Sequence, residues 1–147
     1  MATKNTSKRT NSVTVPPASP QTPDIRYTTT HEWVRMENAT VAVIGLTEYG
    51  LKNLGDLVAI DLPELEEDLL RGKPFCEVES VQHLTDIFSP VSGEVVACNE
   101  EIQFNIDLLN QDPYGRGWIL KLKIEDANEL DDLMTQKAYE KHISAGK

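Results

Sequence analysis

The fold of this chain is decided by the stretch from residue 76 to residue 98, which reads CEVESVQHLTDIFSPVSGEVVAC. Two strand-like runs, Pro74 to Val81 and Asp86 to Phe88, flank a tip at Gln82-His83. A third run, Gly93 to Cys98, follows after turn residues. Because a tip between two strands is exposed and firmly held, it is where a carrier domain displays a functional group.

An internal repeat surrounds this hairpin. Gly55-Asp56-Leu57-Val58-Ala59 matches Gly93-Glu94-Val95-Val96-Ala97 thirty-eight positions later, and Leu69-Leu70 matches Leu108-Leu109 at an offset of thirty-nine. Two similar β units in one small domain predict a pseudo-twofold sandwich of two sheets. Chance similarity between strand-like pentapeptides is the alternative.

The rest of the chain is predicted to be mostly β, with two helices. Thr40 to Gly45 and Gly117 to Ile124 have strand patterns. Thr47 to Leu54 is predicted to be a short helix that Thr47 caps and Gly55 ends. Apolar residues three or four apart from Ala127 to Ser144 predict a C-terminal amphipathic helix.

Composition divides the chain into a tail and one domain. Residues 1–24 are rich in Ser, Thr, Pro and Asn and have almost no large apolar side chains, which predicts a disordered tail. Its basic character also fits an organelle transit peptide, but weakly, because it lacks an amphipathic pattern. Residues 25–147 have the length of a single domain.

The charge of the chain restricts its partners. The 147 residues have a net charge of -10. Such an acidic domain repels phosphate backbones and anionic lipid headgroups, so we expect no nucleic-acid partner and no membrane. The sequence also has no apolar run long enough to span a bilayer and no secretory signal.

No catalytic or metal-binding pattern is recognisable, so we do not expect an enzyme. Cys76 and Cys98 are the only cysteines and have no metal spacing. We interpret them as small buried hydrophobes, with a disulfide or a reactive thiol as the alternatives. The three histidines are isolated, and no Ser-His-Asp set or phosphate loop can be assigned.

Several short motifs occur in order between residue 25 and about residue 143. They are Thr30-His31-Glu32-Trp33-Val34, Ile44-Gly45-Leu46-Thr47, Leu54-Gly55-Asp56, Leu62-Pro63-Glu64, Val78-Glu79-Ser80-Val81, Ser89-Pro90-Val91-Ser92-Gly93-Glu94-Val95-Val96, Asn110-Gln111-Asp112-Pro113-Tyr114-Gly115, Gly117-Trp118 and Glu129-Leu130-Asp131. Taken together, they make this part of the chain resemble the H protein of the glycine cleavage system. The resemblance implies a lipoyl/biotinyl-like barrel-sandwich hybrid with a short internal helix and a C-terminal helix. A biotinyl domain is disfavoured because the Met-Lys-Met tip is missing.

The chain departs from the family at its most important position. In the family, the residue directly after Glu-Ser-Val is a lysine that carries lipoate in amide linkage, whereas this sequence has Gln82. A carboxamide nitrogen is delocalised and cannot replace the nucleophilic amine. His83 and Leu84 are also larger than the small residues usual in the family. We therefore expect no covalently attached lipoate here.

Two acids match the cleft in which the family shelters its aminomethylated arm. They are Glu32, in the His-Glu-Trp motif, and Asp86, four residues after the lipoyl-attachment position. The residues alone favour an ordinary surface acid or turn cap at each position.

The resemblance implies three partners: glycine decarboxylase, aminomethyltransferase and dihydrolipoyl dehydrogenase. It also implies a monomer in the cytoplasm, or in the mitochondrial matrix of a eukaryote. Three functions remain open. The first is a family carrier of the aminomethyl group, which Gln82 opposes. The second is a non-lipoylated paralogue that is a scaffold or regulator, and the third is a small-ligand binder that uses the vacated cleft.

Overall fold

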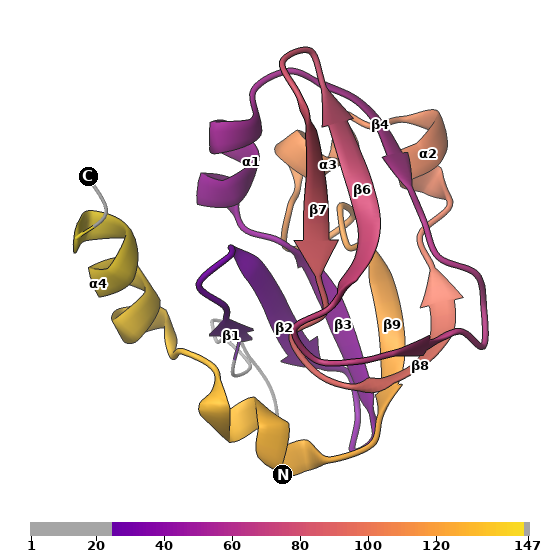
Figure 1. The fold of residues 1–147 in the computed structure, drawn as a ribbon, viewed down its shortest axis with the longest axis vertical. Coiled ribbons are helices and arrows are strands. Elements are labelled where there is room, and N and C mark those ends of the chain that lie inside the picture. Colours follow the sequence, from indigo (N-terminus) through magenta and orange to yellow (C-terminus); the bar gives the residue numbers. More distant parts are fainter. Residues whose placement is uncertain (1–24, 146–147) are drawn as a thin grey trace, which may run out of the picture.

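The computed structural model describes residues 25–145, and the predicted disordered tail, residues 1–24, lies outside this range. The described residues form two antiparallel sheets that pack face to face (Figure 1). The six-stranded sheet has the order β1-β2-β3-β9-β8-β5 and the three-stranded sheet the order β4-β6-β7. The strands are β1 Ile25–Tyr27, β2 Glu32–Met36, β3 Val41–Leu46, β4 Leu57–Asp61, β5 Asp68–Leu69, β6 Pro74–Ser80, β7 Leu84–Phe88, β8 Gly93–Cys98 and β9 Leu120–Ile124. The predicted mostly-β sandwich is confirmed.

One hydrophobic core fills the space between the sheets, because alternate residues of each strand face inward. Ile44 and Leu122 contribute from the larger sheet and Val78 and Ile87 from the smaller one, all at most 2 % exposed. A second, smaller cluster lies on the outer face of the larger sheet, where Trp33 packs with aromatic side chains.

The predicted repeat corresponds to a structural feature in both sheets. The pairing of β4 with β6 shifts register between Leu57 and Ala59, and that of β8 with β9 shifts between Val95 and Ala97. The two irregularities therefore fall at equivalent positions of the pentapeptides, Val58 and Val96, and each leaves an exposed valine. The second match, however, was misleading: Leu69 belongs to a strand, whereas Leu108 and Leu109 begin a helix.

Short helices close one end of the sandwich (Figure 1). They are α1 Glu48–Leu54, α2 Glu101–Phe104 and α3 Leu108–Gln111. The Thr47 side chain accepts a hydrogen bond from the amide of Gly50, and Gly55 follows α1 with a φ of 81°. Both predicted ends of α1 are confirmed.

The prediction of one continuous C-terminal helix is wrong. It divides into the 3-10 helix η1, Ala127–Asp132, and the α-helix α4, Gln136–Ala145. Between them the chain becomes extended, because Met134 pairs with Tyr27 through backbone hydrogen bonds in both directions, each 2.9 Å. This pairing with β1 interrupts the helical hydrogen bonds that the spacing of apolar residues had suggested.

Strand ends also differ from the prediction. Strand β9 begins at Leu120 and not at Gly117, because the amides of Gly117 and Trp118 donate within the preceding turn. Ile119, directly before β9, already donates to the carbonyl of Ile44. In contrast, β7 begins at Leu84, two residues before its predicted start, since Leu84 pairs with Glu79.

Candidate functional site

The tip of the β6–β7 hairpin projects beyond the rest of the smaller sheet (Figure 1). Val81, Gln82 and His83 form the tip, and all three are exposed. Strand pairing supports them up to Glu79 and Leu84, directly beneath the tip. The sequence prediction of an exposed tip at Gln82 is therefore confirmed.

Ser80 holds the shape of this tip. Its hydroxyl donates to the carbonyl of His83 over 3.1 Å and accepts from the amides of Gln82 and His83 over 3.3 and 3.2 Å. The amide of Val81 donates to the carbonyl of Asp56 over 3.0 Å, which ties the tip to the chain after α1. These contacts fix the backbone and leave the Gln82 side chain free to reach solvent.

Glu32 is a buried acid on the larger sheet. It is 1 % exposed, and its Oε1 accepts from the hydroxyls of Thr28 and Thr30 over 2.5 Å each. Its Oε2 accepts from the backbone amide of Phe88 over 3.1 Å. This last bond joins β2 to the end of β7, so Glu32 connects the two sheets.

A cleft of about 420 Å³ opens beside Glu32. Thr28, Thr30 and Phe88 line it, together with the exposed side chains of Arg71 and Asp132 at its border. The cleft therefore combines hydroxyl groups, an aromatic side chain and a buried carboxyl. Its volume lies within the range of small-molecule sites in proteins.

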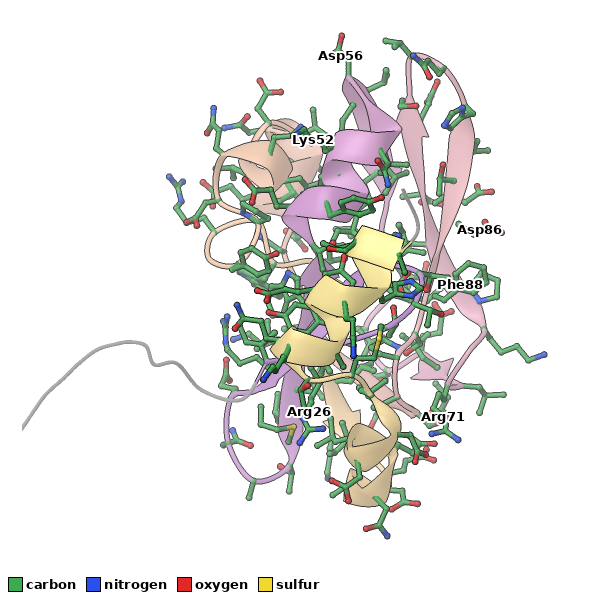
Figure 2. The ribbon with its side chains drawn as sticks, turned by 90° about the vertical axis from the view of Figure 1, so that its left-hand side faces the viewer. Arg26, Lys52, Asp56, Arg71, Asp86 and Phe88 are labelled. Atoms are coloured by element: carbon green, nitrogen blue, oxygen red, sulfur yellow. The ribbon has the colours of Figure 1, made fainter. Side chains whose placement is uncertain are left out.

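Asp86 lies on β7 but is not among the residues that line the cleft. It is exposed, and it shares a strand face with Phe88, two residues farther along. Figure 2 shows Asp86 and Phe88 in succession along the hairpin, with Arg71 farther from the tip. The structure thus brings Glu32 and Phe88 together and leaves Asp86 outside the cleft on the route toward Gln82.

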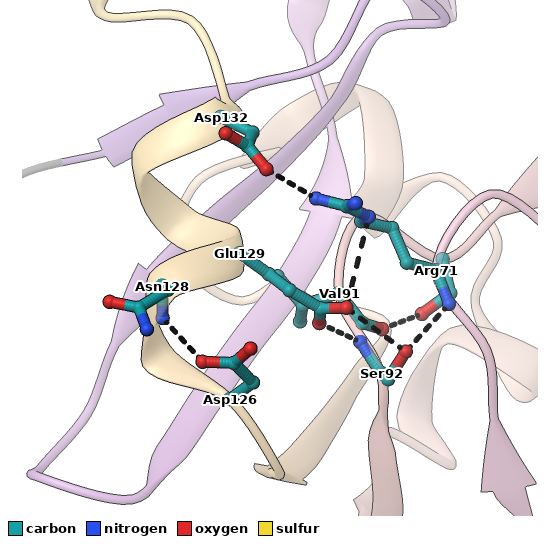
Figure 3. A network of polar contacts seen from close by, with 8 residues as sticks. Arg71, Val91, Ser92, Asp126, Asn128, Glu129 and Asp132 are labelled. Carbon is teal, nitrogen blue, oxygen red and sulfur yellow. Dashed lines mark hydrogen bonds and ion pairs between the residues drawn. The ribbon is translucent and has the colours of Figure 1, made fainter.

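A polar network holds η1 at the border of the cleft (Figure 3). Arg71 pairs with Asp132 over 2.7 Å and lies 3.7 Å from Glu129, whose other oxygen accepts from the amide of Ser92 over 2.7 Å. The amide of Arg71 donates to the Ser92 hydroxyl over 2.9 Å. The network joins three segments that are distant in the sequence.

Sequence reasoning missed Arg71 and Asp132, because residues sixty-one positions apart carry no local signal of contact. Thr28 and Thr30 were recognisable in principle. They lie four and two positions before Glu32, close enough in the sequence for their hydroxyls to reach its carboxyl group.

Burial raises the pKa of Glu32 above its ordinary value of 4.5, although the Thr28, Thr30 and Phe88 donors oppose the rise. A raised folded-state pKa means that the unfolded chain releases this proton first as pH increases. The contribution of Glu32 to the free energy of unfolding is therefore largest below pH 4.5 and is lost as pH rises through the folded-state pKa.

We predict that Glu32→Gln abolishes this pH dependence. Urea unfolding measured at pH values from below 4.5 to neutrality should show the native chain losing stability relative to Glu32→Gln as pH increases. The exposed Glu77→Gln is the control and should follow the native profile. Parallel profiles for the native chain and Glu32→Gln would contradict the prediction.

The two cysteines are free thiols in different surroundings. Cys76 is buried, which raises its pKa, and Cys98 is partly buried and donates to the carbonyl of Pro63 over 3.2 Å. A raised pKa disfavours the thiolate, so neither is a nucleophile at neutral pH. Within residues 25–145, no cluster of three His, Cys, Asp or Glu residues is arranged to hold a metal ion.

The fold and the exposed hairpin tip define a barrel-sandwich hybrid of the lipoyl/biotinyl type. A family model described as glycine cleavage H-protein matches residues 25–146. The chain belongs to the glycine cleavage H-protein family, whose members are carrier proteins rather than enzymes. None of the helices in the described part of the chain is long and apolar enough to cross a membrane.

Individual relatives agree with this assignment. The glycine cleavage system H protein of Aeromonas salmonicida is 44% identical over 117 residues, covering 80% of this chain and 91% of the relative. That of Halothermothrix orenii is 40% identical over 120 residues, covering 82% and 93%. The crystal structure of the H protein from Mycobacterium marinum matches with a TM-score of 0.76 at 30% identity, covering 84% of this chain and 98% of that one.

Proposed function

We propose that this chain is a component of the glycine cleavage system that does not itself carry lipoate. The supporting observation is Gln82, which occupies the exposed tip directly after Glu79-Ser80-Val81, where the resemblance implies the lipoyl lysine. Hydrogen bonds hold the backbone of the tip. What the tip lacks is therefore an amine on the side chain at position 82, and not an exposed, ordered place for one.

The residues of the tip do not fit a lipoyl group in amide linkage. Val81 and Gln82 offer no amine, and an imidazole such as that of His83 does not form a stable amide. Lys73 precedes the far end of β6, eight residues before Val81, so it lies about 26 Å from the tip along the strand. Lys52 is in α1, outside the hairpin. The tip therefore has no group on which an aminomethyl unit could be carried.

The surface that remains supports binding to the enzymes of the system. Glycine decarboxylase, aminomethyltransferase and dihydrolipoyl dehydrogenase are the proposed partners. The exposed tip keeps a hairpin shape, and Val81 and Leu84 add an apolar surface, being 66% and 60% exposed. We propose that residues 25–147 form the domain that binds these enzymes, and that the chain is a monomer. It would act as a scaffold or regulator in the cytoplasm or the mitochondrial matrix.

The cleft beside Glu32 favours a second function, small-ligand binding. A volume of about 420 Å³ with a buried carboxyl and the border residues Arg71 and Asp132 suits a small polar molecule. Asp86 lies between this cleft and the tip, and its role in holding a bound amine stays a prediction.

A reconstituted glycine cleavage assay tests the main proposal. The three partner enzymes are combined with a lipoylated H protein, and glycine-dependent release of carbon dioxide is measured. The native chain alone should support no release above background. Added in excess over the lipoylated H protein, it should lower the rate by competing for the same partners.

Matched variants separate loss of docking from loss of the arm. Val81→Ser combined with Leu84→Ser removes the apolar surface of the tip and should relieve the inhibition, while Phe104→Ser, on an exposed side chain of α2, should not. If the native chain alone supports carbon dioxide release, the proposal that it carries no lipoyl group is wrong. If the native chain does not compete with the lipoylated H protein, the proposal that both bind the same enzymes is wrong, and the cleft beside Glu32 is left as the functional site.

A further inference from the structure

The four tyrosines of the chain are far apart in the sequence, but all of them line one small pocket. They are Tyr27 in β1, Tyr49 in α1, Tyr114 in the turn before β9 and Tyr139 in α4. The pocket has a volume of about 210 Å³, and none of its lining residues lines the cleft beside Glu32. Four aromatic residues around one space resemble the cages that bind cations, although Tyr27 and Tyr139 each cover one face of the other's ring.

The charged residues that line this tyrosine pocket are all acidic. Glu48 and Glu140 line it, and no Lys or Arg does among the residues the structure describes. Both carboxylates are on exposed residues at its border, so they add attraction for a cation without themselves being buried. Ring faces and carboxylates therefore favour the same kind of ligand.

Three of the four rings are held in place before any ligand binds. Tyr27 and Tyr139 stack with centroids 4.6 Å apart and planes within 7°. The Tyr139 hydroxyl lies 2.7 Å from Oγ1 of Thr47 and 2.8 Å from Nδ1 of His31, and the Tyr114 hydroxyl accepts from the amide of Glu48 over 3.2 Å. A preformed cage loses little side-chain entropy on binding.

The Tyr27 side chain also lines this pocket. Tyr27 is 7% exposed, and no residue from 25 to 145 gives its hydroxyl a hydrogen bond. Burial, followed by the nearby Tyr114, Tyr139 and Glu140, raises the pKa of Tyr27 to about 12, so the hydroxyl is neutral and lies among these groups.

We propose that the tyrosine pocket binds an organic ammonium group, either on a free small molecule or on a lysine side chain of a partner protein. The volume of 210 Å³ is below that of typical drug-sized sites, so it suits the cationic head alone. The rings of Tyr49 and Tyr114 are partly exposed and so stand nearest the entrance. An ammonium group there meets π faces, the Tyr27 hydroxyl oxygen and two carboxylates.

Titration of the full chain with choline, followed by amide NMR shifts at constant ionic strength, tests this inference. The neutral tert-butyl analogue of choline, in which carbon replaces the nitrogen, is the matched ligand control. Choline should give saturable shifts at Glu48, whose amide bonds Tyr114, and the analogue should not. A capped lysine peptide and its norleucine counterpart repeat the comparison, and show which of the two sources binds more tightly.

Two variants that spare the core locate the site. Tyr49→Leu removes one cage ring and should weaken binding about three- to thirtyfold. Glu140→Gln should weaken it a few fold, since it removes one carboxylate. Phe104→Leu and Glu125→Gln are the controls, exposed residues outside this pocket, and should bind as the native chain does.

Two results would overturn the proposal. The first is equal shifts with choline and its neutral analogue, which would mean that the positive charge is not recognised. The second is unchanged affinity in both Tyr49→Leu and Glu140→Gln, which would place the cation elsewhere on this acidic protein. Thermal unfolding of each variant, measured beside the titration, shows that a loss of binding is not a loss of folding.

Discussion

Gln82→Lys is expected to convert this chain from one that is not lipoylated into one that is at least partly lipoylated. The substitution places an amine at the exposed tip, directly after Glu79-Ser80-Val81. Ser80 holds the backbone there through its own contacts with residues 82 and 83, which do not depend on the side chain at position 82. Incubation with a ligase active on ordinary H proteins, followed by intact-mass analysis, measures the gain of one lipoyl group.

His83 and Leu84 decide how complete the modification is. Both side chains are exposed beside position 82, and Leu84 is 60% exposed, where a ligase would contact it. Gln82→Lys combined with His83→Ala and Leu84→Ala should be modified faster than Gln82→Lys alone. The exposed Gln103→Lys, in α2 and outside the tip, is the control and should stay unmodified. If neither tip variant gains mass, the tip is not a lipoylation site.

Gly45→Ala is expected to destabilise the fold strongly, by about 3 kcal/mol in the free energy of unfolding. A Cβ at this position of β3 would lie 2.6 Å from Cζ2 of Trp33, a distance that real Cβ contacts do not show. Trp33 is fully buried, and its Nε1 donates to the carbonyl of Pro113 over 3.1 Å, so the ring cannot move aside. Urea unfolding followed by circular dichroism measures the loss.

Gly72→Ala is the matched control for this substitution. An added Cβ there meets nothing within 4 Å, so its cost comes only from the left-handed backbone, with φ of 83°. That cost is about 1–2 kcal/mol. A Gly45→Ala variant no less stable than Gly72→Ala would show that the sheet relaxes around Trp33, and would weaken the view that β2 and β3 hold Glu32 rigidly.

The sandwich was predictable because its determinants are local. Pro90 and Gly93 mark a turn, alternation marks the strands, and the pentapeptide repeat falls on matching irregularities at Val58 and Val96. Helix α1 was predictable for the same reason, since Thr47 and Gly55 lie at its ends. The break between η1 and α4 was not, because it depends on a backbone pairing of Met134 with a strand more than a hundred residues earlier.

The candidate site shows the same division. Gln82 was placed correctly because a hairpin tip follows from the two strands beside it. The burial of Glu32 depends on Phe88, which a different sheet brings to it, and the border of the cleft depends on Arg71 and Asp132. The tyrosine pocket gathers residues from four separate segments. Contacts between distant segments leave no periodic pattern, so these features required the three-dimensional fold.

The intact mass of the protein purified from its native host tests the missing arm most directly. The chain has an exposed hairpin tip without an amine, and its nearest lysines, Lys52 and Lys73, lie outside that tip. We predict a mass without a lipoyl increment, from cells in which lipoylation of other proteins is verified in parallel. A lipoyl increment on any lysine of this chain would contradict the account.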